Sequence, residues 1–327
     1  MMTKKVRWGI MGSSFISEVM AKAIDESVEG ELIAIGSRSP SKLSSFAARF
    51  LVPKSYVNYQ DMLNDGDIDA IYIGLPNYLH KEWTIRSAHA KKHILCEKPF
   101  VLTVSEAQEA FLAVAQNNVY CLEALMYRYH PLIKQLTKLV ADKVIGDIKL
   151  FNASYSAPIA HLANPKAGGA LRNLGCYPIS LIRLLAGAEP IEIKAMGRFN
   201  PQTGNDNQTT ILLKFANNVL ATVSTTDDVG KFWHFEMIGE KGRIQVLSNP
   251  WQANIDDNII VVTLNDKQIP QQIAVNATHS LYCYQINEMN NKILNGFSSA
   301  ESSDSNQHSL GNIVVLESCW QQLASSC

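Results

Sequence analysis

The stretch Val6–Ser17 reads VRWGIMGSSFIS and decides how the first part of the chain folds. A short apolar run, Val6–Met11, is followed at once by Gly12, by two serines and by an amphipathic segment that starts at Ile16. This order predicts a buried strand, a tight turn and the beginning of a helix. The remainder of the N-terminal half repeats the pattern.

Short apolar runs alternate with amphipathic segments up to residue 123. The predicted strands are Val6–Met11, Leu32–Gly36, Ala70–Leu75, His93–Cys96 and Val119–Leu122. The predicted helices are Ile16–Ala23, Ser41–Phe50, Tyr59–Asn64, His80–Ala90 and Ser105–Gln116. Such alternation is typical of βαβ units, whose right-handed crossovers build a parallel sheet. The sequence therefore predicts an α/β protein whose residues 1–123 form a doubly wound, Rossmann-like domain.

Extended segments dominate residues 124–327, which we expect to form a second α/β domain with a mostly antiparallel sheet. The predicted strands are Ile148–Tyr155, Ile191–Met196, Thr209–Phe215, Val219–Thr225, Phe232–Ile238, Arg243–Leu247 and Ile259–Leu264. Asn217-Asn218 and the segment 239–242 are typical hairpin turns. Helices are predicted over Pro178–Leu185 and Ser280–Asn295, and the serine-rich segment 298–309 is predicted to be a solvated loop before a last helix.

The charge balance excludes several classes of partner. The chain has 327 residues with 29 Lys plus Arg against 30 Asp plus Glu, and its basic residues form no run longer than a pair. This predicts no binding to nucleic acid or to a membrane surface. No export signal and no apolar window of about 20 residues is found. We expect small molecules and other protein chains as partners.

Cysteine and histidine spacing predicts no metal. The six cysteines form no CxxC pair, and the histidines show no HExxH spacing. Free cysteines of this kind are typical of a reducing compartment, so the expected location is the cytoplasm.

The first turn is a candidate dinucleotide site. Of the three glycines in the GxGxxG pattern only Gly12 is present, and Ser14 and Ser17 occupy the other two positions. Serine is small and its hydroxyl can bind a phosphate oxygen at the start of a helix. The residues expected to hold the cofactor here are Gly9, Gly12, Ser13, Ser14, Phe15 and Ile16. An ordinary strand–turn–helix connection is the alternative.

The end of the second strand favours NADP over NAD, although NAD remains possible. A site that prefers NAD carries a carboxylate here, whereas this chain has Ser37 and Arg38. A hydroxyl and a guanidinium suit the 2′-phosphate of NADP. The alternative is that Arg38 is simply a solvated loop residue.

Four further motifs carry a resemblance. They are GLPNYLH at 74–80, CEKP at 96–99, EALMYRYHP at 123–131 and GGALRNLGCYP at 168–178. In this order and spacing the chain resembles the Gfo/Idh/MocA oxidoreductases, nearest to the branch of dimeric dihydrodiol dehydrogenases and NADP-linked xylose dehydrogenases. The resemblance implies a Rossmann domain, a C-terminal α/β domain with an open sheet, and NADP-dependent hydride transfer to or from a sugar or cyclic polyol.

The resemblance also implies residue roles. Lys98 is catalytic and precedes a cis proline, while Tyr177 transfers the proton. Leu75, Pro76, Asn77 and His80 line the nicotinamide ribose, and Glu97 anchors it. An unperturbed phenol is a poor base at neutral pH, and a nearby ammonium such as that of Lys98 favours its phenolate.

Asn173 departs from the family pattern, which has Asp at this position. Asparagine keeps a hydrogen-bond acceptor but loses the charge. Three consequences remain open: a different substrate, slower turnover, or a nicotinamide-binding sensor without catalysis. Asn173 is alternatively a helix cap. Met126 and His161 are expected to contact substrate, with core packing and simple solvation as the respective alternatives.

Trp233, Phe235 and Met237 alternate along one predicted strand and form an apolar sheet face. Family members cover such a face by dimerising, so the resemblance implies a homodimer through the open sheet. The alternative is that this face packs on the domain's own helices.

Overall fold

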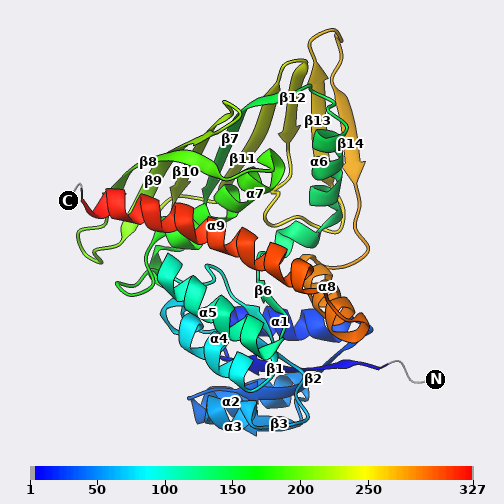
Figure 1. Cartoon of the computed structure of the whole chain (residues 1–327), viewed down its shortest axis with the longest axis vertical. Coiled ribbons are helices and arrows are strands. Elements are labelled where there is room, and N and C mark those ends of the chain that lie inside the picture. Colours follow the sequence, from blue (N-terminus) through cyan, green and yellow to red (C-terminus); the bar gives the residue numbers. More distant parts are fainter. Residues whose placement is uncertain (1–3, 326–327) are drawn as a thin grey trace. The chain divides into compact units, whose positions relative to one another are not determined.

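The computed structural model describes residues 4–325, which form two compact units (Figure 1). The first unit extends to Met126 and also includes Tyr282–Leu310, and the second contains Tyr127–Leu281 and the chain from Gly311 onward. The sequence predicted a single boundary at residue 123 and a continuous second domain. The structure differs because the chain returns to the first unit after residue 281.

A parallel sheet of six strands lies at the centre of the first unit, in the order β3-β2-β1-β4-β5-β6. Its strands are β1 Val6–Met11, β2 Gly30–Gly36, β3 Lys54–Tyr56, β4 Ala70–Ile73, β5 His93–Cys96 and β6 Cys121–Glu123. Its helices are α1 Phe15–Glu26, α2 Pro40–Phe50, α3 Tyr59–Leu63, α4 His80–His89 and α5 Val104–Asn117. The predicted doubly wound domain is confirmed. The strand order reverses between β1 and β4, which is where such folds bind their ligands.

Helix α8, Leu281–Asn295, joins the first unit through buried polar groups. The indole N–H of Trp8 on β1 donates to Asn290 Oδ1 at 2.9 Å, and Asn290 Nδ2 donates to Ser27 Oγ at 3.0 Å. The Ser27 hydroxyl in turn donates to Asn287 Oδ1 at 2.6 Å. Buried polar groups without partners are costly, so these bonds fix where α8 packs. Sequence periodicity predicts the helix but does not reveal this packing partner.

The second unit contains an eight-stranded, mostly antiparallel sheet in the order β14-β13-β12-β11-β7-β10-β9-β8 (Figure 1). Its strands are β7 Ile148–Ser156, β8 Pro190–Phe199, β9 Asp206–Phe215, β10 Leu220–Thr226, β11 Phe232–Gly239, β12 Gly242–Val246, β13 Asn258–Leu264 and β14 Gln271–Val275. Its complete helices are α6 Pro131–Ala141 and α7 Cys176–Ala186. Both predicted hairpins form. The short strands β3 and β14 escaped prediction because neither has a fully buried residue.

The predicted serine-rich loop is wrong. Helix α9, Ser299–Ala324, begins at this segment. Ser298 Oγ accepts the N–H of Glu301 at 3.2 Å, and the Glu301 carboxylate accepts the N–H of Ser298 at 2.8 Å. This is a capping box, which satisfies backbone N–H groups that the first helical turn leaves unpaired. The S-x-x-E signal of this capping box is present in the sequence, whereas the high serine content of the segment indicates a loop.

The apolar face of β11 belongs to the core of the second unit. Phe235 and Met237 are fully buried and pair across the strand boundary with Ala153 and Phe151 of β7. Trp233 lies on the same side, half-buried. Of the two alternatives for this face, packing within the domain is therefore correct. A dimer through the sheet requires the opposite face.

None of the helices within residues 4–325 is long and apolar enough to cross a membrane. Five of the six cysteines lie in this part of the chain, and all five are buried and form no disulfide. Cys327 lies outside the described residues.

Candidate functional site

The turn after β1 depends on a glycine at residue 12. Gly12 has a φ of +100°, and a Cβ there would stand 2.7 Å from the carbonyl oxygen of Gly74. Its N–H donates to Gly36 O at 2.9 Å, and the N–H of Gly74 donates to Met11 O at 2.9 Å. The ends of β1, β2 and β4 are thus joined by backbone contacts. Gly9, by contrast, lies inside β1, where a Cβ would meet Met62 Cε at 2.4 Å, so its role is packing.

The two serines keep the start of α1 intact. Ser14 is the N-cap of this 12-residue helix, and the N–H of Ser14 donates to Ser17 Oγ at 3.3 Å. Ser17 is fully buried, and its hydroxyl would lie 3.0 Å from a Cβ at Gly74. Phe15 is 79% exposed at the rim of the turn. A glycine turn with small serine side chains, ahead of a 12-residue helix, fits the phosphates of a dinucleotide.

Ser37 and Arg38 lie at the end of β2, as the sequence predicted. Ser37 Oγ is 2.8 Å from Ser13 Oγ, so the turns after β1 and β2 meet through their hydroxyls. Ser37 is buried and Arg38 is exposed. Arg38 also interacts with the phenol of Tyr59. Burial raises the pKa of Tyr59, and Arg38 offsets only part of that rise. Residues 36–39 include no carboxylate.

The EKP segment follows β5, and its predicted cis bond between Lys98 and Pro99 is confirmed. Glu97 is 9% exposed, and both of its carboxylate oxygens accept hydrogen bonds. Tyr72 Oη donates to Oε1 at 2.7 Å, and the N–H of Lys98 donates to Oε2 at 3.2 Å. Burial raises the pKa of Glu97, while the charge of Lys98 and the bond from Tyr72 oppose that rise.

His80 supports two turns from inside the unit. Its ring is 1% exposed, with Nδ1 3.0 Å from Pro99 O and Nε2 2.8 Å from Leu75 O. Burial lowers the pKa of His80. Both ring nitrogens face backbone carbonyls, so His80 fixes the turn that carries Pro76 and Asn77 against the EKP turn. Asn77 begins the 3₁₀ turn η1 and is buried.

Asn173 lies in a π-helical turn, Leu171–Gly175, that continues directly into α7. Its N–H donates to Gly169 O at 3.0 Å and its side-chain amide donates to Gly168 O at 3.5 Å. The cap alternative for Asn173 is therefore wrong, because the helical conformation starts before this residue. π-helical turns of this kind occur often at functional sites.

Asp206 at the start of β9 holds that π-helical turn, and the sequence analysis missed it. Its Oδ1 accepts the N–H of Gly169 at 3.0 Å, and its Oδ2 accepts the N–H of Leu171 at 2.5 Å. A Cβ on Gly169 would lie 1.8 Å from Asp206 O, so only glycine fits there. Burial raises the pKa of Asp206 although both bonds and the charge of Arg172 lower it. The strand was predicted to begin at Thr209, which left Asp206 outside it.

Asp227 is a second buried carboxylate beside this turn. It is 1% exposed, and its pKa is raised to about 6 by burial and by the charges of Asp206 and Asp228. Its carbonyl accepts the N–H groups of Ile159 and Ala160, both at 3.0 Å. These bonds anchor the loop that leads to His161. His161 itself is exposed, within the 3₁₀ turn Ala160–Leu162.

Tyr177 is surrounded by aromatic rings. It lies in the first turn of α7 and is 8% exposed. The ring centroids of Tyr127 and Tyr155 lie 6.2 and 5.7 Å from its own, and the ring of Trp251 lies tilted against that of Tyr155 with a centroid distance of 4.8 Å. The Tyr127 hydroxyl donates to Ser180 Oγ at 2.8 Å. No local sequence signal marks Tyr155 or Trp251, because they come from strand β7 and a distant loop.

Met126, expected to contact substrate, is 2% exposed in the first unit.

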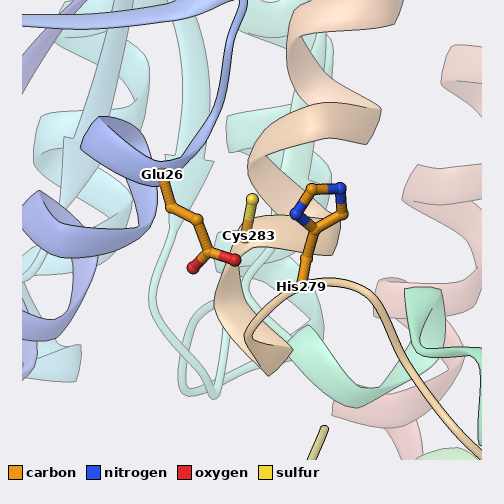
Figure 2. A group of neighbouring side chains, drawn as sticks. All are labelled: Glu26, His279 and Cys283. Atoms are coloured by element: carbon orange, nitrogen blue, oxygen red, sulfur yellow. The ribbon is translucent and has the colours of Figure 1, made fainter.

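Glu26 and Cys283 meet within the first unit, at the end of α1 and the start of α8 (Figure 2). Burial, followed by the charge of Glu26, raises the pKa of the Cys283 thiol to about 11. The thiol is therefore protonated at neutral pH, and the pair adds a polar contact between α1 and α8. The third residue labelled in Figure 2, His279, belongs to the second unit.

Two family descriptions match the chain. Residues 6–124 match "Oxidoreductase family, NAD-binding Rossmann fold", and residues 133–245 match "GFO/IDH/MocA C-terminal domain". An uncharacterised oxidoreductase of Rhizobium meliloti is 33% identical over 273 residues, covering 81% of this chain and 80% of that protein. The chain belongs to the Gfo/Idh/MocA oxidoreductase family.

Named relatives are also similar. A trans-1,2-dihydrobenzene-1,2-diol dehydrogenase of Xenopus tropicalis is 30% identical over 254 residues, covering 75% of this chain and 76% of that protein. KijD10, a 3-ketoreductase from Actinomadura kijaniata solved with TDP-benzene and NADP, is 25% identical with a TM-score of 0.86 and 98% coverage of both chains. An aldose-aldose oxidoreductase from Caulobacter crescentus shares the fold at 21% identity and a TM-score of 0.86, covering 99% of both chains.

The raised pKa of Asp227 predicts how stability changes with pH. The folded-state pKa of about 6 lies above the ordinary 3.8, so the folded protein holds a proton that the unfolded chain releases as pH rises between these values. Wild-type stability is therefore expected to fall across that range. Asp227→Asn should gain about 1–3 kcal/mol relative to wild type between pH 4.5 and pH 7. Melting temperatures at the two pH values measure this.

The neighbouring carboxylate supplies the control. Asp228 is exposed, and its pKa is lowered by a hydrogen bond from Thr226. Asp228→Asn loses this favourable bond to a carboxylate and only relieves part of the repulsion on Asp227, so its gain at pH 7 should be clearly smaller than that of Asp227→Asn. Equal behaviour of the two variants would contradict the assignment to Asp227.

Proposed function

We propose that this protein is an NADP-dependent oxidoreductase that transfers a hydride between the cofactor and a hydroxyl or carbonyl carbon of a sugar or cyclic polyol. The observation that carries this proposal is the retention of Lys98, beside a firmly held Glu97, together with a buried Tyr177 in a chain of an oxidoreductase family. Relatives named for dihydrodiol oxidation and ketone reduction support a CH–OH group as the reacting centre.

The residues of the first unit fit the cofactor. When bound, NADP supplies or accepts the hydride at its nicotinamide ring. Gly12, Ser13 and Ser14 would hold the pyrophosphate at the start of α1, because a helix N-terminus offers free N–H groups and the residues of the turn are small. Ser37 and Arg38 would hold the 2′-phosphate through a hydroxyl and a guanidinium.

Lys98 and Tyr177 would manage the proton. A phenol transfers a proton at neutral pH only where its surroundings favour the phenolate, and an ammonium group does so by charge. The rings of Tyr127 and Tyr155 lie edge-on to the Tyr177 ring, and this packing limits where the Tyr177 side chain can place its hydroxyl. We assign Lys98 the role of stabilising negative charge on oxygen and Tyr177 that of proton carrier.

Asn173 supports an alternative, a nicotinamide-binding sensor with reduced or lost catalysis. Its amide donates to Gly168 O, so the residue takes part in the local turn structure without a charge. An uncharged side chain cannot balance an ammonium group. The two proposals differ in one observable, which is substrate-dependent turnover.

Turnover should depend on Tyr177. With NADP and a panel of aldoses, inositols and cyclic diols, Tyr177→Phe is expected to lose about 100-fold or more in kcat, because proton transfer typically contributes this much. Absorbance of the reduced nicotinamide measures the rate. Asn173→Asp tests whether a restored carboxylate raises it. NADP binding without turnover in wild type and in Asn173→Asp would instead support the sensor.

Arg38 should determine cofactor preference. Arg38→Ala is expected to lower the ratio of kcat/KM for NADP to that for NAD by about tenfold or more, since a hydrogen bond to a charged group is lost. Arg49→Ala is the matched control, because Arg49 is a half-exposed arginine on the following helix that pairs with Glu18. An unchanged ratio in Arg38→Ala would show that Arg38 is a solvated loop residue.

We also propose a cytoplasmic homodimer. Buried cysteines that form no disulfide within the described residues suit a reducing compartment. On the outer face of the second unit's sheet, Met196 of β8 is 81% exposed, Leu212 of β9 is 54% exposed and Leu220 of β10 is 51% exposed. Apolar side chains that share an exposed sheet face are typical of an interface.

The dimer has a direct test. Light scattering after gel filtration should give twice the chain mass for wild type and a single chain for Leu212→Glu, since a buried unpaired charge opposes association. Ile269→Glu places the same charge at a loop residue that is 82% exposed, and should leave the dimer intact. A monomeric wild type would exclude the proposal.

A further inference from the structure

We propose that Tyr72 is a positioning residue for the cofactor site, acting through Glu97. The inference rests on the proposed function, because it requires that the EKP turn contacts the nicotinamide half of the cofactor. Tyr72 lies on β4 and is fully buried. Its hydroxyl donates to Glu97 Oε1 at 2.7 Å.

Tyr72 contacts two turns at once. Its hydroxyl holds the carboxylate that also accepts the N–H of Lys98, so the bond fixes the start of the EKP turn. Its ring lies against the other turn, since a Cβ on Gly74 would stand 2.8 Å from the ring atom Cε1. Gly74 O in turn would lie 2.7 Å from a Cβ on Gly12. One side chain therefore connects the phosphate turn, the GLPN turn and the EKP turn.

The hydrogen bond also affects the charge of Glu97. Burial favours the protonated carboxyl, whereas the Tyr72 hydroxyl and the Lys98 ammonium favour the carboxylate. The other titratable groups that act on Tyr72 or on the adjacent thiol of Cys96 are Tyr282, Cys121 and Glu123. His80 packs against the same turn and is affected by the charge of Lys98. Loss of the Tyr72 hydroxyl removes a donor to the carboxylate, so Glu97 should protonate at a higher pH.

The experiment measures NADPH affinity by fluorescence from pH 5.5 to pH 8.5. In Tyr72→Phe, binding is expected to weaken by about tenfold at the acid end, and the midpoint of weakening should move to higher pH than in wild type. The 2′-phosphate of the cofactor titrates in every variant, so only differences between variants report on the protein. A midpoint in Tyr72→Phe equal to that of wild type would overturn the proposal.

The chain offers a matched control. Tyr56 on β3, at the edge of the same sheet, donates its hydroxyl to Asp65 Oδ2, also at 2.7 Å, and not to a residue of the three turns. Its backbone carbonyl accepts the N–H of Ser37, and Tyr56→Phe leaves that bond in place. Tyr56→Phe removes the same kind of bond within the same unit. It should leave the pH midpoint of NADPH binding unchanged. An equal shift in both variants would show a general effect of stability and would contradict a positioning role.

A double variant tests whether Tyr72 acts through Glu97. Glu97→Gln removes the titrating group, so its NADPH affinity should vary with pH only as the cofactor phosphate does. Adding Tyr72→Phe to Glu97→Gln should cause no further shift, since the partner no longer ionises. A further shift of the midpoint would overturn the proposal. Should Tyr72→Phe fail to fold, Glu97→Gln is the remaining test, because an affinity that still varies with pH beyond the titration of the cofactor phosphate would exclude Glu97 as the group through which Tyr72 acts.

The outcome separates this inference from the proposed function. A wild-type protein that binds no NADPH at any pH would refute the proposed function and the inference together. A wild-type protein that binds NADPH and turns over substrate, with an unshifted Tyr72→Phe, would refute the inference alone.

Discussion

The close approach of Gly12 to the carbonyl of Gly74 is the contact on which the first unit's site depends. There is no room for a side chain between the two turns, so the end of β1 and the end of β4 hold each other at backbone distance. Tyr72 and His80 then connect the second of these turns to the EKP segment. The three turns of the site are thereby joined to one another as well as to the sheet. Rigid placement of binding groups is what a cofactor site requires.

In the second unit, a buried carboxylate holds the backbone of the candidate site in place. Asp206 satisfies the backbone N–H groups at the start of the helix that carries Asn173 and Tyr177, where a negative charge also suits the helix dipole. The cost is a carboxylate removed from water, with Asp227 close enough to raise that cost further. Carboxylates with raised pKa values are more common at functional sites than elsewhere in proteins. The π-helical turn between Asp206 and α7 is likewise a feature that is typical of functional sites.

Sequence reasoning succeeded where a local pattern and the structural requirement coincided. The bounds of β1 and β5 are those predicted, because each is a short, mostly apolar run next to turn residues, a pattern typical of a buried strand. The hairpin at Asn218 formed as expected, since asparagine tolerates the positive φ of 62° that this turn requires. The prediction of a loop over the serine-rich segment was wrong, because a high serine content indicates a loop whereas the capping signal of Ser298 and Glu301 indicates a helix start. For β11, periodicity predicted the apolar face correctly but could not show that the domain itself, and not a second chain, covers that face.

The sequence by itself determined the fold class, the order of most elements, the family and the identity of the motif residues Lys98, Asn173 and Tyr177. These follow from local periodicity and from motifs that keep a fixed spacing along the chain. Only the tertiary structure showed that Tyr72 bonds Glu97, that Asp206 holds the π-helical turn and that α8 returns to the first unit. Each of these contacts joins residues that are distant in sequence and satisfies a buried polar group. Which partner satisfies such a group is decided by the packing of the whole unit, and no local pattern encodes it.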